Sequence, residues 1–154
     1  MDQSSIVFIS MMSAVGLAAL VLAVFFVARA WKRRRRSLEM DDMEGHEFEY
    51  FCADLLRDKG FLDVEVTRGS GDFGVDILAE KDGVTYAVQC KCYNAPIGIK
   101  AVQEIYAGRD YYDRMVGVVM TNQYFTSAAV DAAKKLKILL WDRGYLESMM
   151  EELD

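Results

Sequence analysis

An uncharged segment of 23 residues, from Ile6 to Ala28, constrains the fold of this chain more than any other feature. An α-helix of this length is about 34 Å long at about 1.5 Å per residue, enough to cross the ~30 Å hydrocarbon core of a bilayer. The basic sequence WKRRRRS begins at Trp31, separated from this segment by two residues, and Lys and Arg mark the cytoplasmic side of a spanning helix. We therefore predict a transmembrane helix over residues 6–30 in the cell (inner) membrane, with the tail 1–5 outside and the remaining chain in the cytoplasm.

A cleaved signal peptide is the alternative for this segment. It fits less well because the N-terminus is acidic at Asp2, the apolar run is long, and the basic cluster follows the run instead of preceding it. Beside a spanning helix the basic residues are expected to contact anionic lipid, although a nucleic-acid patch is the other reading of such a run.

Charge is divided unevenly along the chain. Residues 1–36 hold one acid and six bases, which leaves 23 acids and 12 bases, a net charge of about −11, in residues 37–154. Three cysteines are too few for a disulfide framework, and the single histidine, His46, excludes a His-rich zinc site. The second part of the chain is therefore expected to be an acidic domain from a reducing compartment.

The apolar pattern of this second part predicts an alternation of helices and strands. Their order, α-β-β-β-α-β-α-β-α, indicates an α/β fold with a mixed sheet between helix layers and Met115–Thr121 as its central strand. We assign residues 31–43 to a basic juxtamembrane segment and linker, and residues 44–154 to the domain. The predicted helices are 44–59, 100–113, 126–136 and 145–153, and the predicted strands are 62–67, 75–81, 84–92, 115–121 and 138–141.

Asp82-Gly83 is a strong signal for a two-residue hairpin turn between the second and third strands. If these two residues form the turn, paired positions sum to 165, and Asp76 lies opposite Gln89. Directly opposed side chains share a face with their Cβ atoms about 5 Å apart, and Lys91, two residues further on, projects from the same face. The hairpin is therefore predicted to bring together a carboxylate, an amide and an ammonium group.

These three groups suit a metal-assisted attack on a phosphate. Mg²⁺ takes oxygen ligands and needs only one or two protein carboxylates, so Asp76 and Gln89 are candidate ligands, with Mn²⁺ as a substitute ion. Lys91 is a candidate to orient the attacking water and to offset developing charge. Glu49, at the edge of the apolar face of the first helix, is a further candidate, either as a ligand of a second metal or as the residue that holds the water.

These residues resemble the catalytic domain of Mrr-type restriction endonucleases, a branch of the PD-(D/E)XK nuclease superfamily in which glutamine replaces the second acid. The resemblance covers roughly residues 43–146. The segments that carry it are Phe48-Glu49 with Leu55-Leu56, the glycine-rich GSGDFGVD ending at Asp76, Gln89-Cys90-Lys91, Thr121-Asn122 with Phe125-Thr126, and Leu140-Trp141-Asp142.

The resemblance implies a restriction-endonuclease-like three-layer α-β-α fold and a metal-dependent DNA endonuclease of restriction or defence type. It implies Asp76, Gln89 and Lys91 as the catalytic core, with Glu49 assisting, and Mg²⁺ held by Asp76, Gln89 and Glu49. DNA is then the substrate, and cleavage of both strands favours a homodimer. Asp72, in the glycine-rich loop, has two open roles, to shape the turn or to take part in the site.

Two other functions stay open. One is a catalytically inactive, membrane-tethered DNA-binding or scaffold module with the same fold, and the other is a structural membrane protein. The acidic charge of the domain disfavours tight DNA binding, although Lys134, Lys135 and Lys137 are candidate phosphate contacts. Cys90 and Cys92 are expected to be buried strand residues rather than zinc ligands. No Walker lysine follows the glycine-rich loop, which disfavours a nucleotide cofactor.

Overall fold

The computed structural model describes residues 16–28, 30–31, 39–67 and 73–151, and the chain divides into two compact units, Met1–Arg36 and Ser37–Asp154. In the first unit, residues 16–28 form a helix whose side chains are exposed. Among the described residues, no helix is both long enough and apolar enough to cross a membrane. The predicted span of residues 6–30 and the basic run after it lie partly outside the described residues.

The second unit follows the predicted order of elements, and each predicted segment overlaps an observed one. This confirms the α/β class. The helices are α2 (Gly45–Asp58), α3 (Ile99–Tyr111), α4 (Ser127–Leu136) and α5 (Arg143–Glu151), and the strands are β1 (Leu62–Val66), β2 (Ile77–Lys81), β3 (Val84–Lys91), β4 (Val116–Thr121) and β5 (Ile138–Trp141).

The sheet is mixed, with the strand order β1-β2-β3-β4-β5. Strands β1, β2 and β3 pair antiparallel, whereas β3, β4 and β5 pair parallel. The central strand is therefore β3, and the prediction that Met115–Thr121 occupies the middle of the sheet is wrong. An apolar run indicates that both faces of a strand are buried, as they are in β4. It does not indicate where the strand lies in the order of the sheet. Gln89 and Lys91 interrupt the apolar run of β3, so the sequence pattern did not identify β3 as the central strand.

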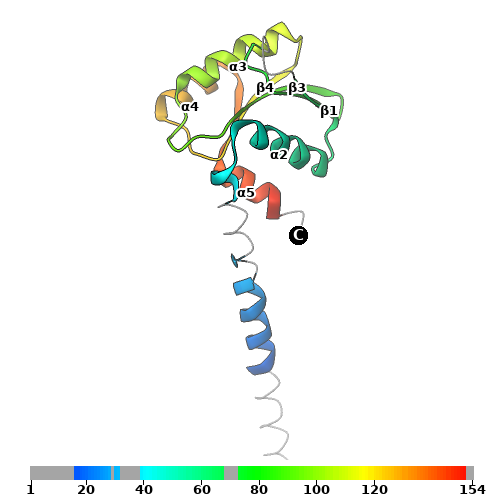
Figure 1. Ribbon diagram of the computed structural model, residues 1–154, viewed down its shortest axis with the longest axis vertical. Coiled ribbons are helices and arrows are strands. Elements are labelled where there is room, and N and C mark those ends of the chain that lie inside the picture. Colours follow the sequence, from blue (N-terminus) through cyan, green and yellow to red (C-terminus); the bar gives the residue numbers. More distant parts are fainter. Residues whose placement is uncertain (1–15, 29, 32–38, 68–72, 152–154) are drawn as a thin grey trace, which may run out of the picture. The chain divides into compact units, whose positions relative to one another are not determined.

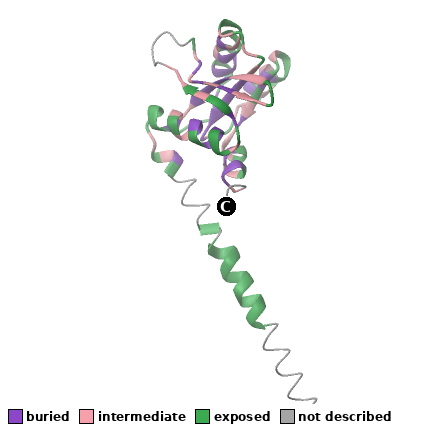
Figure 2. Ribbon diagram, turned by 90° about the vertical axis from the view of Figure 1, so that its right-hand side faces the viewer, coloured by how far each residue is buried: buried purple, intermediate pink, exposed green. Residues whose placement is uncertain are grey.

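Helices cover both faces of this sheet (Figure 1). On one face, α2 and α5 pack through residues such as Leu56 and Leu146. On the other face, α3 and α4 pack through residues such as Ile105 and Ala129. Buried residues accordingly gather on the strands and on the helix surfaces that face them (Figure 2). The second unit thus has three layers, with apolar side chains on both sides of the sheet.

The predicted hairpin register is confirmed over all of β2. Pairs run from Lys81↔Val84 to Ile77↔Val88, so paired positions sum to 165. The turn residues Asp82 and Gly83 have φ angles of 54° and 77°, and positive φ at both positions is what a type I′ turn requires. This turn sets which residues of β3 lie next to the start of β2.

Residues 39–42, which the sequence assigns to the linker, form a short helix. Met40 is fully buried in the α2 side of the core. The thiol of Cys92 donates to the carbonyl oxygens of Met40 and Met43 at 3.4 and 3.3 Å, and Asp41 pairs with Arg143. One buried methionine within an acidic stretch has no periodicity, so the sequence carries no signal for this contact.

Gly108 of α3 packs against the chain that leads into β2. A Cβ at this position would lie 2.5 Å from Val75 Cγ2 and 2.7 Å from the Phe73 carbonyl oxygen. Alanine normally favours a helix over glycine by about 1 kcal/mol. We nevertheless expect Gly108→Ala to lower the free energy of unfolding by about 1–3 kcal/mol, because overpacking outweighs helix propensity. Chemical denaturation would measure this change.

Gly45→Ala is the matched control, since no atom lies within 4 Å of a Cβ built at the first residue of α2. This variant should be neutral or slightly more stable than the wild type. If Gly108→Ala is as stable as Gly45→Ala, the close approach of α3 to the strand layer is not a constraint on the fold.

Candidate active site

Asp76 lies one residue before β2, where the backbone turns into the sheet. Its N–H donates to the Val88 carbonyl at 2.8 Å, and its carbonyl accepts from Thr67 N at 2.9 Å. The carboxylate reaches across to β3, where Oδ2 accepts a hydrogen bond from the backbone N–H of Cys90 at 2.6 Å. The side chain of Asp76 is therefore tied to β3 at the residue that follows Gln89.

Gln89 is a polar residue of β3 that is almost completely buried. Only 1% of its surface is exposed, although its side chain is an amide. Nε2 donates to Glu104 Oε2 at 2.9 Å, but Oε1 is buried without a hydrogen-bond partner among the described residues. A buried acceptor without a partner costs about 1–3 kcal/mol, so the oxygen is a candidate acceptor for a bound water or ion.

Lys91 ends β3 beside Gln89. Its side chain is 23% exposed, and Nζ lies 3.5 Å from Glu104 Oε2. The backbone of Lys91 is held from the neighbouring strand, because the Thr121 hydroxyl donates to the Lys91 carbonyl at 2.7 Å. The ammonium group is thus positioned by its strand and its ion pair, while it keeps access to solvent.

Glu104, on α3, joins these groups and is not among the residues predicted from the sequence. Its carboxylate also lies 3.5 Å from Nζ of Lys100. Burial alone raises the pKa of Glu104, but the hydrogen bond from Gln89 and the charges of Lys91 and Lys100 outweigh burial, and the net pKa is lowered. Ala101 and Gly108 are buried on α3, and Glu104 lies between them on the helix surface, a placement that depends on how α3 packs against the sheet.

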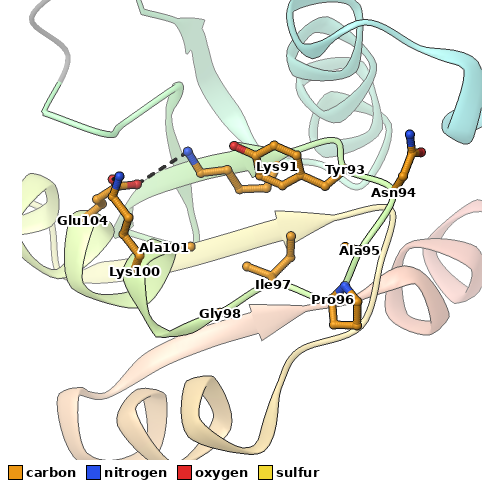
Figure 3. Close-up of a pocket in the computed structure, with 10 residues that line it drawn as sticks. All are labelled: Lys91, Tyr93, Asn94, Ala95, Pro96, Ile97, Gly98, Lys100, Ala101 and Glu104. Carbon is orange, nitrogen blue, oxygen red and sulfur yellow. Dashed lines mark ion pairs between the residues drawn. The ribbon is translucent and has the colours of Figure 1, made fainter.

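A cavity of about 390 Å³ opens beside Lys91. Figure 3 shows Lys91 and Glu104 pointing toward each other along one side of it, and the loop from β3 to α3 forming the rest of its wall. The side chains around this cavity include Lys91, Tyr93, Asn94, Pro96, Lys100 and Glu104. A polar substrate can therefore reach the ammonium group of Lys91 from solvent.

Glu49 lies on α2, the helix that packs on the opposite face of the sheet from α3. Its Oε2 is 2.8 Å from Nδ1 of His46, and its negative charge contributes to raising the pKa of the Cys90 thiol. Its predicted role as a metal ligand or water holder stays a prediction. Asp72, whose role was open, lies outside the described residues.

Cys90 is buried on β3, as expected from the sequence. Burial, together with Cys52, raises the pKa of the Cys90 thiol well above its usual range. In the part of the chain that the structure describes, no three His, Cys, Asp or Glu side chains form a group that could hold a metal ion. The predicted set of Asp76, Gln89 and Glu49 contains two carboxylates and one amide, and it stays a prediction.

Residues 40–150 match the restriction endonuclease family defined by the Mrr catalytic domain. The chain belongs to this family. The match begins at Met40, which is fully buried in the core that also contains the apolar face of α2. A comparison with curated proteins finds no match.

Solved structures share the fold. A protein of unknown function, AF1548, has a TM-score of 0.58 and 25% identity over 68% of this chain and 64% of its own. The DNA modification-dependent restriction endonuclease AspBHI has a TM-score of 0.59 and 19% identity over 79% of this chain and 35% of its own. The restriction endonuclease MspJI, solved with a 27-mer oligonucleotide, has a TM-score of 0.53 and 19% identity over 80% and 31%. This chain thus spans less than two thirds of each.

Replacing Glu104 should change how stability depends on pH. Its lowered pKa means that the fold favours the ionised form, so Glu104 stabilises the protein above the ordinary glutamate pKa of about 4.3. This contribution is lost as the pH falls through the folded-state pKa. We expect the difference in Tm between wild type and Glu104→Gln to be largest near neutral pH and to shrink in acid. Thermal unfolding from about pH 7 to about pH 3 would measure it; a gap that stays constant or grows contradicts the ion-pair argument.

Proposed function

We propose that this member of the Mrr family is a DNA endonuclease of restriction or defence type that hydrolyses phosphodiester bonds with a divalent ion. The observation that carries the proposal is the buried Oε1 of Gln89, which has no hydrogen-bond partner among the described residues. Gln89 lies on the same strand as Lys91. It also precedes Cys90, whose backbone N–H donates a hydrogen bond to Asp76. Family membership and the solved complex of MspJI with an oligonucleotide support DNA as the substrate.

The donor atoms suit a hard cation. A carboxylate oxygen from Asp76 and an amide oxygen from Gln89 are the ligand types that Mg²⁺ and Mn²⁺ take, with water and substrate phosphate completing the shell. When bound, such an ion supplies Lewis-acid activation of water and of the phosphate. Gln89 cannot turn its oxygen toward solvent, because the residue is buried, so its oxygen is available only to a group that enters the site.

Lys91 acts on the substrate side of the site. Its ammonium lines the cavity, and a fixed positive charge at that place orients a phosphate and offsets the charge that develops on it. Glu104 and Thr121 restrain this side chain and its backbone. A homodimer, in which two copies cut opposite strands, is part of the proposal for double-strand cleavage.

Cleavage of supercoiled plasmid by the purified chain, with Mg²⁺, Mn²⁺ or EDTA, tests this function. We expect nicked or linear product only with a metal ion. Asp76→Asn and Lys91→Ala should each reduce the rate by at least about 100-fold, since each removes a group that acts on the reacting phosphate. Asp76→Asn keeps an oxygen that accepts from Cys90 N, so the hairpin should still fold.

Asp131→Asn is the control for the carboxylate change, because Asp131 is exposed on α4. It should cleave at the wild-type rate. If the wild type cuts neither plasmid nor linear DNA with either metal but still protects DNA in a footprint, the chain is an inactive binding module. If Asp76→Asn cuts as fast as wild type, the mechanism is wrong.

Membrane attachment is the second part of the proposal, and it depends on the uncharged run of residues 6–28. We expect the full chain to sediment with membranes and to resist carbonate extraction. Leu17→Arg with Val21→Arg should release it, because each Arg costs about 2.5–3.5 kcal/mol at the centre of a span. The control pair Leu62→Arg and Met115→Arg, at exposed sites in the second unit, should leave sedimentation unchanged. Release of the wild type by carbonate would contradict the anchor.

A further inference from the structure

Glu104 contacts the two functional side chains of β3 at once. Its Oε2 accepts from Gln89 Nε2 at 2.9 Å and lies 3.5 Å from Lys91 Nζ. Figure 3 shows Glu104 entering from α3 and Lys91 from β3, with the two charged groups facing each other beside the cavity. The contact to Gln89 spans 15 positions of sequence, so only the folded chain creates it.

This contact decides which way the Gln89 amide is turned. A carboxylate only accepts hydrogen bonds, whereas an amide has one donating and one accepting end. The end of Gln89 that meets Glu104 must therefore be the NH₂ group, and Oε1 lies on the other side of the amide. Without the carboxylate, nothing in the described contacts of Gln89 distinguishes the two ends.

Gly74 keeps the pair in place. A Cβ at Gly74 would lie 3.0 Å from Gln89 Nε2 and 3.1 Å from Glu104 Cβ, so the backbone of Gly74 covers both side chains. The preceding Phe73 stacks on Tyr111 of α3, with 3.9 Å between ring centroids. Since Gln89 is only 1% exposed, water cannot replace Glu104 as the partner of its amide, and a flipped amide would set two acceptor oxygens against each other.

We propose that Glu104 is a positioning residue, which turns the Gln89 amide so that Oε1 faces a divalent ion and which holds Lys91 beside it. This inference rests on the proposed function, because it assigns Gln89 Oε1 to the ion. Glu104 itself stays outside the ligand set, since its oxygens already face Gln89, Lys91 and Lys100. Residues that orient a ligand in this way typically change metal affinity by about 10- to 100-fold when they are replaced.

The test measures Mn²⁺ binding to the full chain without DNA, by loss of the free-ion EPR signal. Glu104→Gln keeps the size of the side chain, but its amide can face Gln89 with either end, so the orientation of Gln89 is no longer enforced. We expect Mn²⁺ to bind about 10- to 100-fold more weakly. Glu65→Gln, the same change at an exposed position of β1, should bind Mn²⁺ as the wild type does.

The reciprocal exchange separates orientation from a purely structural role. In the double variant Gln89→Glu with Glu104→Gln, the amide on α3 donates to a carboxylate on β3, and a carboxylate presents an oxygen to the ion in either orientation. Mn²⁺ affinity should return to within a few-fold of wild type, even if the thermal stability of the metal-free protein does not. Failure of this recovery in a folded double variant overturns the inference.

The same measurement separates the two proposals. If wild type does not bind Mn²⁺, the metal-dependent function itself is wrong. If wild type binds Mn²⁺ and cuts DNA, but folded Glu104→Gln binds Mn²⁺ equally well, the proposed function stands and the positioning role of Glu104 is wrong.

Discussion

The central strand β3 is the constraint on which the rest of the second unit depends. It pairs antiparallel with β2 through a two-residue turn and parallel with β4 through α3. Alternate side chains of β3 then enter two different cores: Val88 and Cys90 face α2, whereas Ala87 lies in the core under α3. Gln89 and Lys91 continue the Ala87 side by strand alternation. An amide is thus forced into a buried layer, where its hydrogen bonds have to be provided by the fold.

Gln89 is buried although only one of its two polar ends has a hydrogen-bond partner in the described contacts. A fold selected for stability alone would place an apolar residue here, as at Ala87 and Val119 on the same side of the sheet. The fold instead provides Glu104 for the NH₂ end and leaves the oxygen without a partner in the described contacts. A ligand that satisfies the oxygen would also stabilise the protein, and the proposed ion would in this way couple its own binding to folding of the site.

The sequence predicted the parts of the fold that local chemistry determines. Asp82-Gly83 specifies a turn with two positive φ angles, so the hairpin register followed from two residues. The Ser127–Leu136 helix was predicted from its N-cap residue, Thr126. In the structure the Thr126 hydroxyl accepts a hydrogen bond from the backbone N–H of Ala129. The features that could not be predicted depend on contacts between residues that are far apart in the sequence. The central place of β3, the burial of Met40 and the Gln89–Glu104 contact all arise when separate elements pack, and no local pattern encodes them.

The acidic character of the domain need not oppose a DNA substrate, because charge acts locally at physiological salt. The Debye length is about 8 Å, so carboxylates elsewhere on the surface are largely screened from the cavity. At the cavity, Glu104 pairs with two ammonium groups, Lys91 and Lys100, and the proposed ligand Asp76 adds a second carboxylate. This group is close to neutral by itself, and one divalent ion would make it net positive. Affinity for a phosphodiester would then depend on the ion, whatever the charge of the whole domain.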